Sequence, residues 1–249
     1  MSTYTDNLLA FFKSLTNSSC SCHKKDEIEL IKDKQLLKQL HSSELTVMEK
    51  LFMKAVVVTM ESKYYVHPSI AEFWCTITSI FFAFPLYLLL EFESTTMDPI
   101  MTCFILLSVI TAISSFTYHW TLYKLFSSAD AAFATIMVVL VTFALLGKNP
   151  TTYPIENSPI IWGSALAFTT LIFIKFWEDT ATTSLIIFAL VLPTNFYCML
   201  QLGYYKALVT GIIGISCFII DRKGVAPTHS CWHFFGGLYL YYLGQQLCL

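Results

Sequence analysis

Three histidines at the ends of apolar segments are the residues of this chain best suited to chemistry. His229 and His233 are four residues apart, so on a helix their rings share one face, one turn apart. His119 closes an earlier apolar segment. Neutral imidazole is the commonest protein ligand of transition metals, and three such ligands with a further position for water are typical of a catalytic zinc. A single histidine near a membrane surface is more often a packing residue, so the predicted zinc site depends on all three.

Two further residues are placed to assist a water molecule at such a metal. Ser115 precedes His119 by four residues and shares its helical face. Asp130 follows in the next segment, where it could orient a ligand imidazole or carry a proton. Each also has a structural interpretation, because a helical serine often bonds its own backbone and an aspartate at a helix start can be an N-cap. Since zinc polarises a carbonyl and activates water, the set predicts hydrolysis of an amide or ester.

The composition places these residues in a membrane protein. Of 249 residues, 55% are hydrophobic and only 13% are charged. Soluble domains carry about 25% charged residues. The net charge of -2 favours no polyanionic partner, and no basic patch interleaved with aromatic residues occurs, which argues against nucleic-acid binding.

Two regions differ in character along the chain. Residues 1–56 are polar, and apolar residues recur at roughly helical spacing between Lys24 and Lys54, which predicts an amphipathic helical extension. Residues 57–249 hold seven apolar segments, each near the ~20 residues that a bilayer-spanning helix requires. They lie at about 71–91, 99–119, 129–147, 158–177, 182–200, 204–221 and 230–248. Because lipid offers the backbone no hydrogen-bond partners, these segments must be helices. The sequence therefore predicts an all-α membrane protein, a seven-transmembrane helix bundle with a polar N-terminal extension.

Seven crossings would bring the chemically useful residues to one membrane face. The first, third and seventh segments begin on that face, and the second and sixth end on it. The residues concerned are Glu72, Ser115, His119, Asp130, Asp221, His229 and His233. Glycines in the last two segments, Gly211 with Gly214 and Gly236 with Gly237, would permit close helix contacts.

Three stretches resemble motifs of the alkaline ceramidases. Ser69–Thr76, SIAEFWCT, resembles the motif I-A-E-F-x-N-T of that family's first helix. Ser115–Asp130 contains a pattern similar to S-x-x-x-H-x-T-L…D, and Asp221–His233 is similar to the ending D…H-x-W-W-H. Cys75 and Cys231 stand where these motifs have an asparagine and a tryptophan. The three stretches occur in the family's order and span the predicted membrane core.

This resemblance implies an intramembrane zinc amidase that hydrolyses ceramide to sphingosine and a free fatty acid, in an endomembrane such as that of the endoplasmic reticulum or Golgi. It implies that His119, His229 and His233 hold zinc. It also implies that Ser115 stabilises the oxyanion or orients the water, and that Asp130 acts as general acid and base. The adiponectin-receptor-like proteins of the wider superfamily share this pattern of serine, aspartate and histidine.

The loop before the first segment departs from the family, whose members carry a D-W-C-E-x-N type loop that binds calcium. Val58–Tyr64 offers only Glu61, with Glu72 further on, as plausible oxygen ligands. Lys63 places a cation where an acceptor is expected. Calcium takes six to eight oxygen ligands, so we expect the zinc site to be retained and no strong calcium site.

Two other functions stay open at this stage. One is a calcium-independent hydrolase of another acyl lipid. The other is a non-catalytic, receptor-like or scaffold protein in which zinc is structural. All three interpretations expect the lipid bilayer as surroundings, and turnover that depends on Asp130 would distinguish an enzyme from a scaffold.

Overall fold

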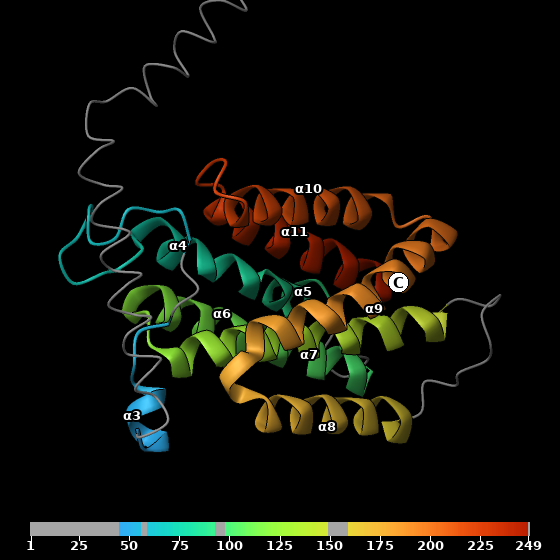
Figure 1. The fold of residues 1–249 in the computed structure, drawn as a ribbon. Coiled ribbons are helices and arrows are strands. Elements are labelled where there is room, and N and C mark those ends of the chain that lie inside the picture. The colour runs from blue at the N-terminus through green and yellow to red at the C-terminus, as the bar shows by residue number, and fades with distance from the viewer. Residues whose placement is uncertain (1–44, 56–58, 93–97, 149–158, 249) are drawn as a thin grey trace, which may run out of the picture. The chain divides into compact units, whose positions relative to one another are not determined.

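The computed structural model describes residues 45–55, 59–92, 98–148 and 159–248, and the structural statements below concern these residues (Figure 1). The chain divides into two compact units, Met1–Lys50 and Leu51–Leu249. Most of the predicted amphipathic extension lies outside the described residues. The short helix α3 (Val47–Leu51) begins with a capping box, because Thr46 and Glu49 each bond the other's backbone amide.

The second unit is helical, and no strand occurs among its described residues. Each apolar segment predicted from the sequence coincides with a helical stretch. The elements are α4 (Phe73–Thr78), η2 (Ser79–Tyr87), α5 (Leu88–Glu91), α6 (Pro99–Thr121), α7 (Lys124–Lys148), α8 (Pro159–Lys175), η4 (Trp177–Asp179), α9 (Thr180–Leu202), α10 (Tyr205–Arg222) and α11 (His229–Cys248).

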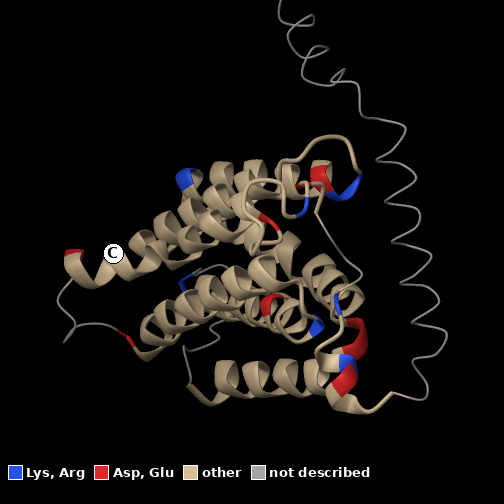
Figure 2. Ribbon diagram, turned by 90° about the vertical axis from the view of Figure 1, so that its left-hand side faces the viewer, with Lys and Arg blue, Asp and Glu red and all other residues tan. Residues whose placement is uncertain are grey.

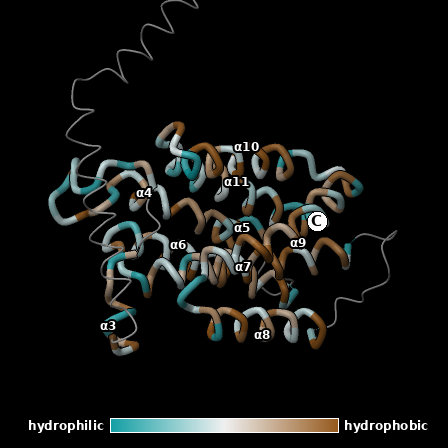
Figure 3. Tube along the Cα trace, viewed as in Figure 1, coloured by the Kyte–Doolittle hydropathy of each residue, from teal (hydrophilic) through white to brown (hydrophobic). Residues whose placement is uncertain are grey.

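These helices have the character of membrane segments. Four stretches within the described residues are long and apolar enough to cross a membrane, namely 73–91, 99–121, 124–148 and 177–202, and α8 is apolar but shorter. Figure 2 shows charged residues mainly towards the helix ends, and Figure 3 shows hydrophobic residues along the helices and hydrophilic ones in the loop before α4. Large apolar side chains face outwards, such as Leu90 at 81% and Ile160 at 79% exposure, which indicates a lipid environment.

The first apolar stretch is an α-helix only at its ends. Its middle, η2, is a 3-10 helix that contains Pro85. Proline cannot donate a backbone hydrogen bond and crowds the preceding turn, which disfavours a regular α-helix there. The same stretch lies close against α11, where a Cβ on Gly237 would stand 2.1 Å from the carbonyl oxygen of Phe81. The predicted close contact at the glycines of α11 is therefore confirmed.

The connection between α6 and α7 is much shorter than the sequence predicts. We expected the third segment to begin near residue 129, whereas α7 begins at Lys124. Leu122 ends α6 in the left-handed conformation, with φ 57°, and only Leu122 and Tyr123 separate the helices. Residues 124–128, KLFSS, extend the helix beyond the predicted apolar stretch, because Lys124, Ser127 and Ser128 are compatible with helix and need not enter lipid. Asp130 accordingly lies inside α7, and the N-cap interpretation of this residue is wrong.

Each helix packs against its neighbours around a shared core (Figure 1). α10 packs on α11, α11 on η2, η2 on α6, α6 on α7, and α7 on α8 and α9. The innermost apolar side chains come from several of these elements. They include Leu88, Phe104, Leu140, Leu145 and Leu243, all nearly or completely buried. At the end of the bundle where α6 ends and α4 and α11 begin, the buried residues include charged and polar side chains.

Candidate metal centre

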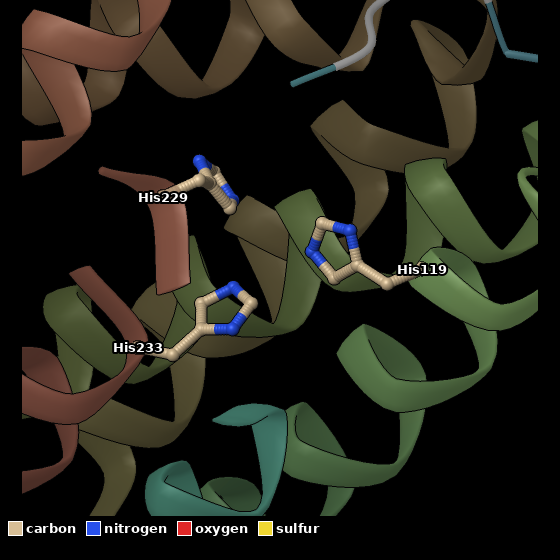
Figure 4. A group of neighbouring side chains, drawn as sticks. All are labelled: His119, His229 and His233. Carbon is tan, nitrogen blue, oxygen red and sulfur yellow. The ribbon is translucent and has the colours of Figure 1, made fainter. Parts of the chain in front are cut away.

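The three predicted histidines meet at one buried point (Figure 4). His119 comes from the last turn of α6, and His229 and His233 from the first turns of α11. Their ring centroids are 5.2 Å apart for His119 and His229, and 4.9 Å apart for the other two pairs. One ring nitrogen from each lies within 4.8 Å of the others, which is close enough for the three to hold a single metal ion.

The outer nitrogens of two rings each lie against an oxygen atom that can only accept. His119 Nδ1 donates to the Glu72 carboxylate, and His233 Nδ1 lies 3.1 Å from the carbonyl oxygen of Cys75. The Thr78 hydroxyl is equally close to His233 Nδ1, but it donates its own proton to the carbonyl oxygen of Trp74. Nδ1 therefore carries the proton in both rings, and Nε2 keeps its lone pair. His119 Nε2 is buried and has no hydrogen-bond partner among the described residues. An unpartnered acceptor is costly in a buried site, and a metal ion there would satisfy it.

His229 has a similar outer partner. Its Nδ1 lies 3.5 Å from Asp221 Oδ2, within the distance of an ion pair but without the geometry of a hydrogen bond. Metal-binding histidines usually present their second nitrogen to a carboxylate or a carbonyl, which fixes the tautomer and aims the other nitrogen at the metal. His119 and His233 follow this arrangement, and His229 has the Asp221 carboxylate beside its second nitrogen, so the donor set fits zinc.

A second group of ligand atoms, from Glu72, Cys75 and His119, also lies within 4.8 Å. This group is the weaker candidate. The Glu72 carboxylate and His119 Nδ1 already bond each other, so they are not both available to a metal ion. The group shares His119 with the three-histidine site, and Glu72 serves that site by orienting its ligand.

Main-chain bonds hold the end of α6, and with it His119, in place. The last carbonyl groups of a helix have no partner within the helix. Here the amides of Ala71 and Glu72 donate to the carbonyl oxygens of Trp120 and His119, at 3.1 and 3.0 Å. The amide of Ala55 donates to Leu122 at 2.7 Å. Chain segments before α4 thus fasten the helix end that carries the first histidine.

Ser115 and Asp130 lie beside the histidines, as the sequence predicts. Ser115 is nearly completely buried, and its hydroxyl is 3.1 Å from that of Ser79. Both Ser115 and His119 interact with the Asp130 carboxyl. Ser114 next to it bonds the carbonyl oxygens of Ile110 and Thr111, which is the structural role considered for a helical serine. The Ser115 hydroxyl instead faces the polar cluster.

The two other predicted positions, Glu61 and Glu72, have different partners. The Glu61 carboxylate accepts from the amides of Trp74 and Cys75, at 2.7 and 2.9 Å, and so caps α4. Glu72 is completely buried and bonds His119 and Lys63. Burial alone raises the pKa of the Glu72 carboxyl, but His119 and Lys63 together hold this pKa below its ordinary value. The group is a carboxylate, and with Lys63 against it these oxygens do not fit a calcium ion.

A cavity of about 250 Å³ adjoins His229. Its lining comes from the loop before α4, from α4 itself, from the end of α10 and the connection after it, and from the start of α11. The lining residues include Glu61, Tyr65, Trp74, Asp221, His229 and Ser230. The site is thus buried on its core side and borders open space beside His229, which is compatible with access by a small molecule.

The comparisons with known proteins add no family. No protein-family model and no curated protein matches the chain. Within the described residues, the protein is all-helical, has membrane-type helices and holds a buried cluster of His119, His229, His233 and Glu72 that could bind a metal ion.

Sequence reasoning missed several members of the cluster. Ser79 contacts Ser115 from a segment 36 positions away, and nothing in its local sequence marks it. The partners of His233 Nδ1 are the backbone carbonyl of Cys75, which has no signature in residue type, and the Thr78 hydroxyl, which nothing in the local sequence marks. Asp221 was expected on the correct face, and its approach to His229 could have been inferred from the connection of only a few residues between α10 and α11.

Proposed function

We propose that the protein is a zinc-dependent intramembrane amidase that hydrolyses ceramide to sphingosine and a free fatty acid in an endoplasmic reticulum or Golgi membrane. The observation that carries the proposal is the convergence of three oriented imidazoles with Ser115 and Asp130. A structural metal would need no acid beside it, whereas hydrolysis needs a group that moves protons. The resemblance of the same residues to alkaline ceramidase motifs supports the choice of substrate.

Zinc at the three histidines would supply Lewis-acid activation of the amide carbonyl and of a water molecule. The Asp130 carboxylate takes a proton from the attacking water while the water oxygen bonds to the carbonyl carbon of the amide. The Ser115 hydroxyl donates to the carbonyl oxygen as that oxygen gains negative charge. Asp130 then delivers the proton to the nitrogen as the C–N bond breaks. The products are a carboxylic acid and an amine, so the atoms of amide and water balance.

The surroundings of the site suit a lipid substrate. The helices that carry it expose apolar side chains, and the candidate site lies at one end of the bundle. In this proposal all seven helical stretches cross the bilayer, including the shorter α8 and the more polar α10 and α11. An acyl chain would remain among apolar side chains while the amide reaches the polar cluster.

Release of fatty acid from ceramide by the purified full-length protein in detergent tests the proposal. We expect activity that is lost on chelation of zinc and in His233→Ala. His67→Ala is the matched control, because His67 is exposed in the loop before α4. Activity that is equal in His233→Ala and wild type would exclude this site as the catalytic one.

A calcium-independent hydrolase of another acyl lipid is the second candidate, favoured by Lys63 beside Glu72. Zinc binding with release from other acyl lipids but from no ceramide would select it. Zinc binding without turnover of any acyl lipid would favour the receptor-like or scaffold function. In that case Asp130→Asn should leave zinc binding unchanged.

A further inference from the structure

We propose that the Lys63 ammonium is a tethered cation that takes the place of a bound metal ion beside Glu72, and that it positions His119 through this carboxylate. The inference rests on the proposed metal site, because positioning His119 matters only if the imidazole binds metal. Lys63 is a positioning residue: the contacts of its ammonium are with Thr59, Glu61 and Glu72.

The ammonium lies in a cage of oxygen atoms. Lys63 Nζ is 2.9 Å from the carbonyl oxygens of both Thr59 and Glu61, and it also bonds Glu72 Oε1. A lysine ammonium has three N–H donors, and these three oxygens match them. The Thr59 hydroxyl adds a fourth oxygen at 3.3 Å. Carbonyl, hydroxyl and carboxylate oxygens are also the ligand types that a hard metal cation would collect.

The loop is folded around this charge. Thr59 is 8% exposed, and its amide and hydroxyl both donate to Glu72 Oε1, at 3.2 and 2.7 Å. The Glu61 amide donates to the Thr59 hydroxyl at 3.2 Å. The carboxylate of Glu61 is turned away to cap α4, so its carbonyl oxygen, and not its side chain, faces the ammonium. These bonds distinguish the pair from an incidental surface ion pair.

Charge explains why a cation is needed here. The Glu72 side chain is 0% exposed, and a buried carboxylate without a counter-charge is strongly unfavourable. Lys63, at 25% exposure, supplies the counter-charge from the loop side. Glu72 Oε1 bonds Thr59 and Lys63, while Oε2 accepts from His119. Fixing the first oxygen therefore fixes the second, and with it the imidazole.

The same arrangement excludes a divalent cation. An ion placed among these oxygens would contact the ammonium, and the two positive charges would repel each other at short range. Calcium would also find four of the six to eight oxygens it takes. We therefore expect wild-type protein to bind zinc without any dependence on calcium.

The test measures zinc affinity of purified full-length protein in detergent, by competition with a chromophoric chelator. Lys63→Ala is expected to bind zinc roughly 10–100-fold more weakly than wild type, the range found when a partner of a metal ligand is lost. Propylammonium, a primary ammonium that can enter the vacated space, should restore most of the affinity. Tetramethylammonium at equal ionic strength has no N–H donors and should not.

Lys206→Ala is the matched control, because Lys206 lies at the other end of the bundle, against the Tyr242 ring. Millimolar calcium should leave both the zinc affinity and the melting temperature of wild type unchanged, and this measurement needs no variant. The inference is overturned if Lys63→Ala binds zinc as tightly as wild type, or if propylammonium does not restore the lost zinc affinity. It is also overturned if zinc binding by wild type depends on calcium. If wild-type protein binds no zinc, the proposed function itself fails, and the inference about Lys63 fails with it.

Discussion

Glu72 and His119 are joined twice, although 46 residues separate them. The Glu72 amide donates to the carbonyl oxygen of His119 at 3.0 Å, and His119 Nδ1 donates to the Glu72 carboxylate. Both side chains are completely buried. The main-chain bond sets where the two residues meet, and the side-chain bond sets the tautomer and the direction of the ring. The start of the first apolar stretch thus determines the aim of a ligand carried by the second.

Glu72→Gln should weaken zinc binding roughly 10–100-fold, because the amide keeps the size of the side chain but loses the charge that holds the His119 proton. The lost ion pair with Lys63 adds to the effect. Competition with a chromophoric chelator measures the zinc affinity of the purified variant. Glu91→Gln is the control, since Glu91 is exposed and bonds Tyr241 and Gln245 away from the histidines. Equal zinc affinity in Glu72→Gln and wild type would contradict the orienting role.

Ser115→Ala and Ser114→Ala form a matched pair on one helical turn. Ser115→Ala should retain zinc but reduce kcat on the order of 100-fold to 1000-fold, as expected when a donor to the developing oxyanion is removed. Ser114→Ala should be close to wild type, because its hydroxyl bonds the backbone of its own helix. Steady-state rates of fatty acid release, with zinc content measured on the same samples, compare the two. Similar rates of fatty acid release for both variants would show that Ser115 has no catalytic role.

Much of the fold could be predicted because a sufficiently long apolar segment indicates a membrane helix. Every predicted apolar segment coincides with a helix, and the alternation of segment ends correctly brought Asp130, His119 and His229 together. The i, i+4 spacing of His229 and His233 predicted a shared face, and the rings do face one point. These features depend on hydropathy and helical period, which a single sequence carries.

The parts that could not be predicted depend on backbone geometry. The 3-10 conformation of η2 reflects its close packing against Gly237 as well as Pro85, and a partner helix is invisible in local sequence. The early start of α7 depends on the left-handed Leu122, a conformation that sequence reasoning assigns to glycine or asparagine. The sequence singles out Lys63 as a cation where an acceptor is expected, but its contact with Glu72 and the Thr59 and Glu61 carbonyl groups around it have no residue-type signal.

Zinc should stabilise the folded protein, because three aligned imidazoles bind it in the folded state and not in an unfolded chain. At free zinc of roughly 100 times Kd the gain is about 2.7 kcal/mol, which raises the melting temperature. Thermal unfolding in detergent, with zinc added back after chelation, measures the shift. His229→Ala should abolish the shift, and His67→Ala should retain it. A shift of equal size in His229→Ala would place the responsible metal elsewhere.

Gly237→Ala should destabilise the bundle by about 1–3 kcal/mol, the usual cost of overpacking. The added methyl would stand 2.1 Å from the Phe81 carbonyl oxygen, and a backbone atom cannot move aside as a side-chain tip can. Gly163→Ala in α8 is the control, because nothing lies within 4 Å of a Cβ built there. That change should be neutral or slightly stabilising, since alanine favours helix over glycine. Thermal unfolding of both variants in the same detergent gives the comparison. If Gly237→Ala proved as stable as Gly163→Ala, η2 and α11 would have to lie farther apart than the Phe81–Gly237 contact requires, and the position of His233 relative to Cys75 would change with them.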